Sequence, residues 1–152
     1  MNYEKLLIEY EKENLTIKEK PLQSSNGRIY NNRIAIKKDL TDAAKACTLA
    51  EELGHYYTTT GDILSQSTVM DRKQEHHARM WAYDKLLPLS LIIKAFEHGC
   101  TNMYETAEYL EVTEEFLIDC IAAYHEKYGS FYRYGEYLFI FSERGIGISK
   151  VL

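Results

Sequence analysis

The chain has 152 residues, 45% hydrophobic and 27% charged, which is enough for one domain with a real hydrophobic core. Its formal net charge of −5 excludes a chain-wide basic field for nucleic acid, and no run of roughly eighteen apolar residues is present to span a membrane. The acidic, amphipathic first residues do not resemble a secretory signal, and three widely spaced cysteines indicate reduced thiols in a cytosolic protein.

The first half of the chain predicts helices around a small β element. Two short apolar runs flank Asn31-Asn32, and asparagine tolerates the positive φ of a tight hairpin turn. Thr41 or Asp39 is a suitable N-cap for the helix that follows. In chain order, we expect a helix at 2–14, a β-hairpin within 27–39, a helix at 41–58 and a loop at 59–69.

The second half predicts further helices and then strands. Gly99 and Gly129 are expected to end helices, and Thr101 and Thr113 to begin them. We expect helices at about 70–87, from Pro88 to His98, at 102–110 and at 113–128, and two or three strands in the tail. The fold class is therefore α+β, mainly α, in a single domain, 1–152.

One stretch of the second predicted helix, TLAEELGHYYT, carries candidate chemistry. Glu51 and His55 are four residues apart, so they share one helical face and can point at the same ion. Glu52 lies beside that face, where a glutamate can accept a proton from metal-bound water. The spacing alone is weak evidence, because a Glu–His pair four apart on a helix is more often a solvated pair.

A third ligand has a natural candidate in Glu75, twenty residues past His55 on the next predicted helix. Small residues indicate that the two helices approach closely, as ligands from both need if they are to meet one ion. These residues are Ala46, Ala50 and Gly54 on the first helix, and Ala78 and Ala82 on the second.

These two separated motifs resemble the ImmA/IrrE family of metallopeptidases. TLAEELGHYYT corresponds to the H-E-x-x-H region, and E-x-x-A-x-x-W-A, beginning at Glu75, corresponds to the segment with the third ligand. The match covers roughly residues 28–90, the expected metal-site core, and is looser over the C-terminal helical pair and strands at about 100–152. The resemblance implies a zinc-peptidase-like helical core, with His55 and Glu75 as metal ligands and Glu52 as general base.

The same resemblance implies a cytosolic zinc-dependent endopeptidase. Proteins of this family are commonly encoded by prophages and integrative elements, where they act against a repressor. The expected partner is therefore a protein substrate, a helix-turn-helix repressor of a mobile element.

Glu51 departs from the family pattern, because it stands where the first histidine is expected. Two carboxylates and one histidine leave a Zn²⁺ site near zero net charge, so the pKa of bound water should rise above the roughly 7 typical of catalytic zinc. An oxygen-rich shell also accommodates Mn²⁺ or Fe²⁺ more readily. Two readings stay open: a metallopeptidase with an altered site, or a weak or inactive member that binds a regulator without cleaving it.

Residues 106–117 have the apolar spacing of a helix-turn-helix, but a DNA reader needs cations on its second helix. This segment instead carries acidic residues: Glu108, Glu111, Glu114, Glu115 and Asp119. We therefore expect a helical pair that packs or docks a protein, with no direct contact to nucleic acid or membrane.

Overall fold

The computed structural model describes residues 1–59 and 72–151. Almost all of the loop predicted at 59–69, and the first two residues of the helix predicted at about 70–87, lie outside these ranges. The chain divides into two compact units, Met1–Leu86 and Leu87–Leu152, which are described separately.

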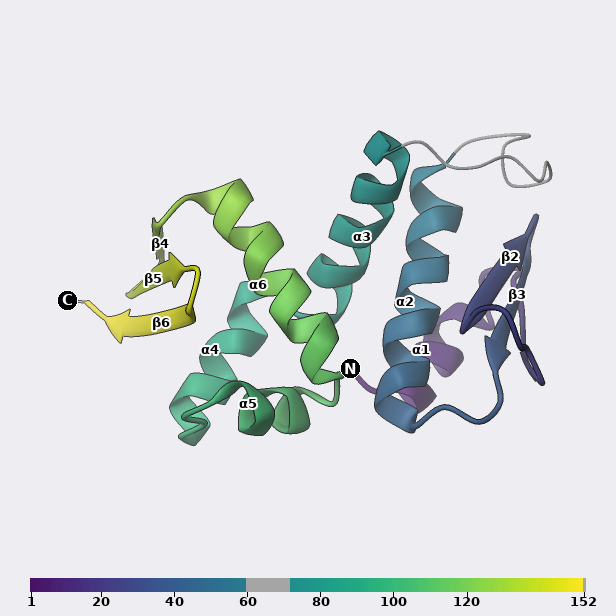
Figure 1. The fold of residues 1–152 in the computed structure, drawn as a ribbon, viewed down its shortest axis with the longest axis horizontal. Helices are drawn as coiled ribbons and strands as arrows, with labels where there is room; N and C mark the ends of the chain where they lie inside the picture. Colours follow the sequence, from purple (N-terminus) through teal and green to yellow (C-terminus); the bar gives the residue numbers. More distant parts are fainter. Residues whose placement is uncertain (60–71, 152) are drawn as a thin grey trace. The chain divides into compact units, whose positions relative to one another are not determined.

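The first unit is a three-stranded sheet and three helices. In Figure 1 the sheet lies on one side of α2, and α3 runs alongside the other. The sheet order is β1-β3-β2, with β1 parallel and β2 antiparallel to the central β3. The elements are α1 (Tyr3–Tyr10), β1 (Thr16–Lys20), β2 (Gly27–Tyr30), β3 (Arg33–Lys37), α2 (Asp42–Thr58) and α3 (Arg72–Leu86).

The predicted hairpin is confirmed as β2 and β3, with Tyr30 opposite Arg33 and Asn31 at φ 54° in the turn. Two features differ from the prediction. The first helix ends at Tyr10 rather than continuing to Asn14, which adopts a left-handed φ of 59°. Strand β1 was not predicted, because its sequence TIKEK is rich in lysine and glutamate, which are depleted in strands.

Close packing between α2 and α3 fixes the centre of this unit. The Thr41 hydroxyl caps α2 as predicted, accepting a hydrogen bond from the Ala44 amide at 3.2 Å. A Cβ atom at Gly54 would overlap the backbone carbonyl of Ala78, so only glycine permits this approach. The small residues that were expected to line this interface, Ala46, Ala50, Ala78 and Ala82, are all fully buried.

The second unit contains α4 (Leu89–His98), α5 (Met103–Leu110), α6 (Glu114–Tyr128) and an antiparallel sheet, β4 (Phe131–Tyr134), β5 (Tyr137–Ser142) and β6 (Gly145–Lys150). The expected ends at Gly99 and Gly129 are confirmed. Thr113 caps α6 as predicted, but α5 is capped by Asn102 and not by Thr101. The Asn102 side chain accepts from the Glu105 amide at 2.8 Å, while Thr101 bonds to the Glu105 carboxylate.

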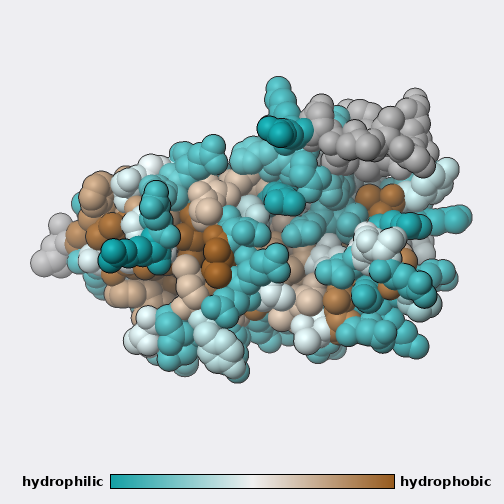
Figure 2. Space-filling model, viewed as in Figure 1, coloured by the Kyte–Doolittle hydropathy of each residue, from teal (hydrophilic) through white to brown (hydrophobic). Residues whose placement is uncertain are grey.

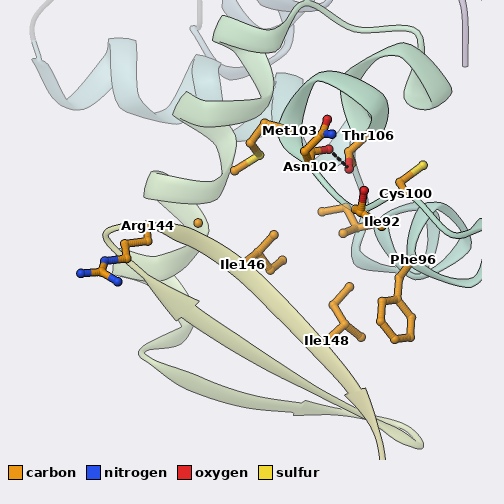
Figure 3. Close-up of a pocket in the computed structure, with 11 residues that line it drawn as sticks. Ile92, Phe96, Cys100, Asn102, Met103, Thr106, Arg144, Ile146 and Ile148 are labelled. Carbon is orange, nitrogen blue, oxygen red and sulfur yellow. Dashed lines mark hydrogen bonds between the residues drawn. The ribbon is translucent and has the colours of Figure 1, made fainter.

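The core of this unit joins α6 to the second sheet through Leu117, Tyr124, Phe139 and Phe141. A cavity of about 320 Å³ lies between α4, the start of α5 and β6. Figure 3 shows Ile146 and Ile148 projecting from β6 on the side of Ile92 and Phe96, while the Arg144 side chain extends away from them.

The predicted fold class, α+β and mainly α, is confirmed by six helices and two small sheets among the described residues. All three cysteines are free thiols, with Cys47 and Cys120 buried. Within residues 1–59 and 72–151, no helix combines the length and apolar character needed to cross a membrane.

Candidate metal centre

The helices α2 and α3 bring two of the predicted ligands together. His55 projects from α2 and Glu75 from the first turn of α3, with 3.6 Å between His55 Nε2 and Glu75 Oε2. Two donors each about 2.1 Å from a tetrahedral Zn²⁺ would be about 3.4 Å apart. The spacing of these two atoms therefore fits a shared divalent ion.

Glu75 is oriented by a residue that the sequence motif does not include. Its second oxygen, Oε1, accepts a hydrogen bond from Arg79 Nε at 3.3 Å, one helical turn further along α3. Arg79 thus leaves Oε2 directed at His55. The i, i+4 spacing of a glutamate and an arginine is the signal that could have revealed this pair.

The imidazole of His55 is held in the neutral state that a metal ligand requires. Burial lowers the pKa of His55, and this effect outweighs the attraction of Glu75, which acts in the opposite direction. The other ring nitrogen, Nδ1, is buried and has no hydrogen-bond partner among the described residues. The polar contact that the ring makes is therefore through Nε2, where the lone pair of a neutral imidazole could bind a cation.

Glu52 has the protonation behaviour of a general base. Burial, together with repulsion from the carboxylates of Glu51 and Glu75, raises its pKa to about 7. A carboxyl group that titrates near neutral pH can both accept and release a proton. The carboxylates of Glu51 and Glu75 are therefore near enough to Glu52 to affect its ionisation.

Strand β2, at the edge of the sheet, lies against Glu52, and the residue at the point of contact is Gly27. A Cβ atom at Gly27 would lie 3.0 Å from Glu52 Oε1 and 2.6 Å from Thr48 Cγ2. The absence of a side chain at Gly27 thus leaves room for the Glu52 carboxylate. Sequence reasoning missed this contact, because it depends on which strand forms the edge of the sheet beside α2.

The structure does not unite all three predicted ligands. Among the described residues, no group of three potential metal-ligating side chains is assembled around one point. Glu51 is half-buried one turn before His55 on α2, and its electrostatic influence reaches both Glu52 and Arg79. A shared ion would thus require the Glu51 side chain to join the pair His55–Glu75.

Other residues near the motif have structural roles. His76 and His77 are exposed on the surface of α3, and Cys47 is buried. Tyr57 stacks on Trp81 with ring centroids 5.3 Å apart, and contacts the ring of Tyr56 at 5.0 Å. The two tyrosines thus belong to one aromatic cluster with Trp81.

Comparison with known proteins identifies a family. Residues 9–119 match the model of the peptidase family M78, described as the IrrE N-terminal-like domain. The match includes all of α2 and α3, and with them every candidate ligand. No curated protein and no solved structure matches the chain. Since the family model covers well over half of the sequence, the chain belongs to the M78 peptidase family, whose model describes the IrrE N-terminal-like domain.

Proposed function

We propose that the protein is a metal-dependent endopeptidase in which Glu51, His55 and Glu75 hold one divalent ion and Glu52 is the general base. The observation that carries the proposal is the 3.6 Å approach of His55 Nε2 to Glu75 Oε2, beside a glutamate whose pKa is raised to about 7. A structural ion pair would account for His55 and Glu75, but it gives no reason for an additional half-buried glutamate with a raised pKa at their side.

The bound ion would supply Lewis acidity, which polarises a scissile carbonyl and lowers the pKa of water. Glu52 takes the proton from the attacking water on its carboxylate and passes it to the leaving amine. Arg79 keeps Glu75 in position, and Gly27 keeps the space above Glu52 open. Zn²⁺ is the proposed ion, with Mn²⁺ or Fe²⁺ as alternatives because Glu51 adds a second carboxylate to the shell.

We further propose that the substrate is a protein regulator, a helix-turn-helix repressor of a prophage or integrative element. The support is chemical complementarity, since repressors that bind DNA carry basic surfaces and complementary charge speeds encounter. The acidic side chains of Glu108, Glu114 and Glu115 on α5 and α6 are all exposed. Reversing these three charges should slow repressor cleavage at low salt, whereas reversing three exposed glutamates elsewhere, Glu4, Glu11 and Glu143, should not.

The test of the metal site is elemental analysis of purified wild type, His55→Ala and Arg79→Ala. Wild type should carry one equivalent of metal and His55→Ala should carry almost none, because a ligand is lost. Arg79→Ala should retain metal with weaker affinity, since mutation of an outer partner typically costs about 10–100-fold. Equal metal content in wild type and His55→Ala would refute the site.

The test of the base is Glu52→Gln, which keeps the shape of the side chain but cannot accept the proton. This variant should bind metal like wild type and show no peptidase activity on the repressor. Activity at the wild-type level would remove Glu52 from its proposed role.

A second candidate function is binding of the regulator without cleavage. Glu51 in place of histidine, and the lack of an assembled three-ligand group among the described residues, favour this alternative. It predicts capture of an intact repressor by a protein purified without metal, with identical binding by wild type and Glu52→Gln.

A further inference from the structure

The outer face of the N-terminal sheet gathers positive charge on all three strands. The strand register places Lys18 of β1 beside Ala35 of β3, which is opposite Arg28 of β2. On the same face, Lys20 of β1 is paired with Lys37 of β3, and Arg33 of β3 is paired with Tyr30 of β2. We call this surface the basic sheet face, and its cations are Lys18, Lys20, Arg28, Arg33 and Lys37.

Alternation along β1 explains why acidic groups are excluded from this face. Glu19 points to the opposite, inner face, where it accepts hydrogen bonds from Lys45 Nζ at 2.9 Å and from the Tyr3 hydroxyl at 3.2 Å. Its neighbours Lys18 and Lys20 therefore point outward, and both are exposed. None of the five cations on the face forms an ion pair with any residue in the described ranges.

The face is also hollowed. A depression of about 490 Å³ is lined by Lys18, Lys20, Arg28, Arg33 and Tyr30, with Ala35 in its floor. Tyr30 is 58% exposed. In Figure 2, hydrophilic residues predominate over the part of the molecule where Figure 1 draws β2 and β3, with only small hydrophobic areas between them.

We propose that the basic sheet face binds the phosphate backbone of duplex DNA without sequence preference. Five cations on one face, which form no ion pair within residues 1–59 and 72–151, produce a local field of the sign that a polyphosphate requires, although the chain has a net charge of −5. Alternate side chains along a strand are about 6.7 Å apart and neighbouring strands about 4.8 Å apart, so the cations form a grid that can meet several phosphates together.

The chemistry of the face favours a duplex over other anionic partners. A single strand is usually bound by successive aromatic side chains that stack on its bases, and this face offers only Tyr30. Insertion into a membrane needs a wide apolar surface flanked by cations, whereas the apolar residues that line this depression are Ile29, Tyr30, Ile34 and Ala35. Contacts from lysine and arginine side chains to phosphates position a protein on the duplex and carry no direct sequence information.

The experiment is fluorescence anisotropy with a labelled 20-base-pair duplex of arbitrary sequence, titrated between 50 and 200 mM salt. If the four exposed cations Lys18, Lys20, Arg28 and Arg33 each neutralise one phosphate, affinity should fall on the order of 100-fold over this range. The variant Lys18→Gln/Arg28→Gln/Arg33→Gln should bind at least tenfold more weakly at 50 mM salt and lose most of the salt dependence. Circular dichroism establishes that the variant is folded.

The matched control removes three exposed cations elsewhere on the chain, Lys5→Gln/Lys12→Gln/Lys94→Gln, and so changes the net charge equally. It should bind DNA like wild type. Equal weakening of both triple variants would overturn the proposal, as would tighter binding to an acidic peptide, to single-stranded DNA or to anionic vesicles than to the duplex. The assay measures binding alone, so a failed peptidase assignment leaves this test intact.

Discussion

Replacing Glu52 by glutamine should stabilise the metal-free protein, and the gain should grow with pH. The Glu52 pKa rises from 4.5 to about 7 on folding, so the folded state binds this proton more tightly than the unfolded state does. The carboxyl group therefore costs little at low pH, and its destabilising effect develops as pH rises from about 4.5 through 7. Glutamine does not titrate and escapes this cost.

The size of the effect follows from the shift. A rise from 4.5 to about 7 sets an upper limit of about 3 kcal/mol for the full cost, since one pKa unit corresponds to about 1.4 kcal/mol. Part of this cost is already present at pH 5, where the unfolded carboxyl is mostly ionised. Between pH 5 and pH 8 the stability difference between Glu52→Gln and wild type should therefore grow by about 2 kcal/mol.

The assay is urea unfolding of both proteins in a chelating buffer at several pH values from 5 to 8. Glu4→Gln, an exposed substitution on α1, is the control and should show a difference from wild type that is flat with pH. A flat difference for Glu52→Gln as well would mean that Glu52 ionises at its ordinary pKa, and the electrostatic account of the site would be refuted. Adding Zn²⁺ should stabilise wild type, because the ion offsets the repulsion among the carboxylates.

Three further changes probe the same centre. Gly54→Val should destabilise the protein by about 1–3 kcal/mol and weaken metal binding, because the side chain would force α2 away from Ala78; chemical unfolding and metal titration check both effects. Gly27→Val should displace Glu52 and lower kcat at least tenfold with metal content preserved, whereas retained kcat would show that β2 does not constrain this carboxylate. Glu51→His should raise the site charge by one unit and move the acidic limb of the pH–rate profile to lower pH; an unchanged profile would show that Glu51 does not contact the ion.

Much of the fold was predictable because local chemistry sets the ends of its elements. Thr41 and Thr113 cap helices through their own hydroxyls, and Asn31 accepts the positive φ of the hairpin. It was also predictable that His55 and Glu75 face each other, because helical spacing places them on one side of each helix and small interface residues indicate that the two helices touch.

The remainder depends on contacts between distant segments. Strand β1 pairs directly with β3, although β2 lies between them in the sequence, and the sequence of β1 gives little sign of a strand. Because β1 was not predicted, the sequence did not show that Glu19 and its neighbours Lys18 and Lys20 lie on opposite faces of a sheet. The negative net charge of the whole chain also gave no sign of a basic surface. The approach of Gly27 to Glu52 likewise depends on the order of strands in the sheet.

The contact of Gly54 with the Ala78 backbone bears on how the proposed metal ion would be bound. Because main-chain atoms meet there, the separation of the two ligand-bearing helices is set without any metal. Binding of the proposed ion would therefore cost little further conformational entropy, whereas small zinc modules fold only when their ion binds. If the proposed ion binds here, it could be exchanged while the polypeptide stays folded, and the supply of the ion would then control activity reversibly.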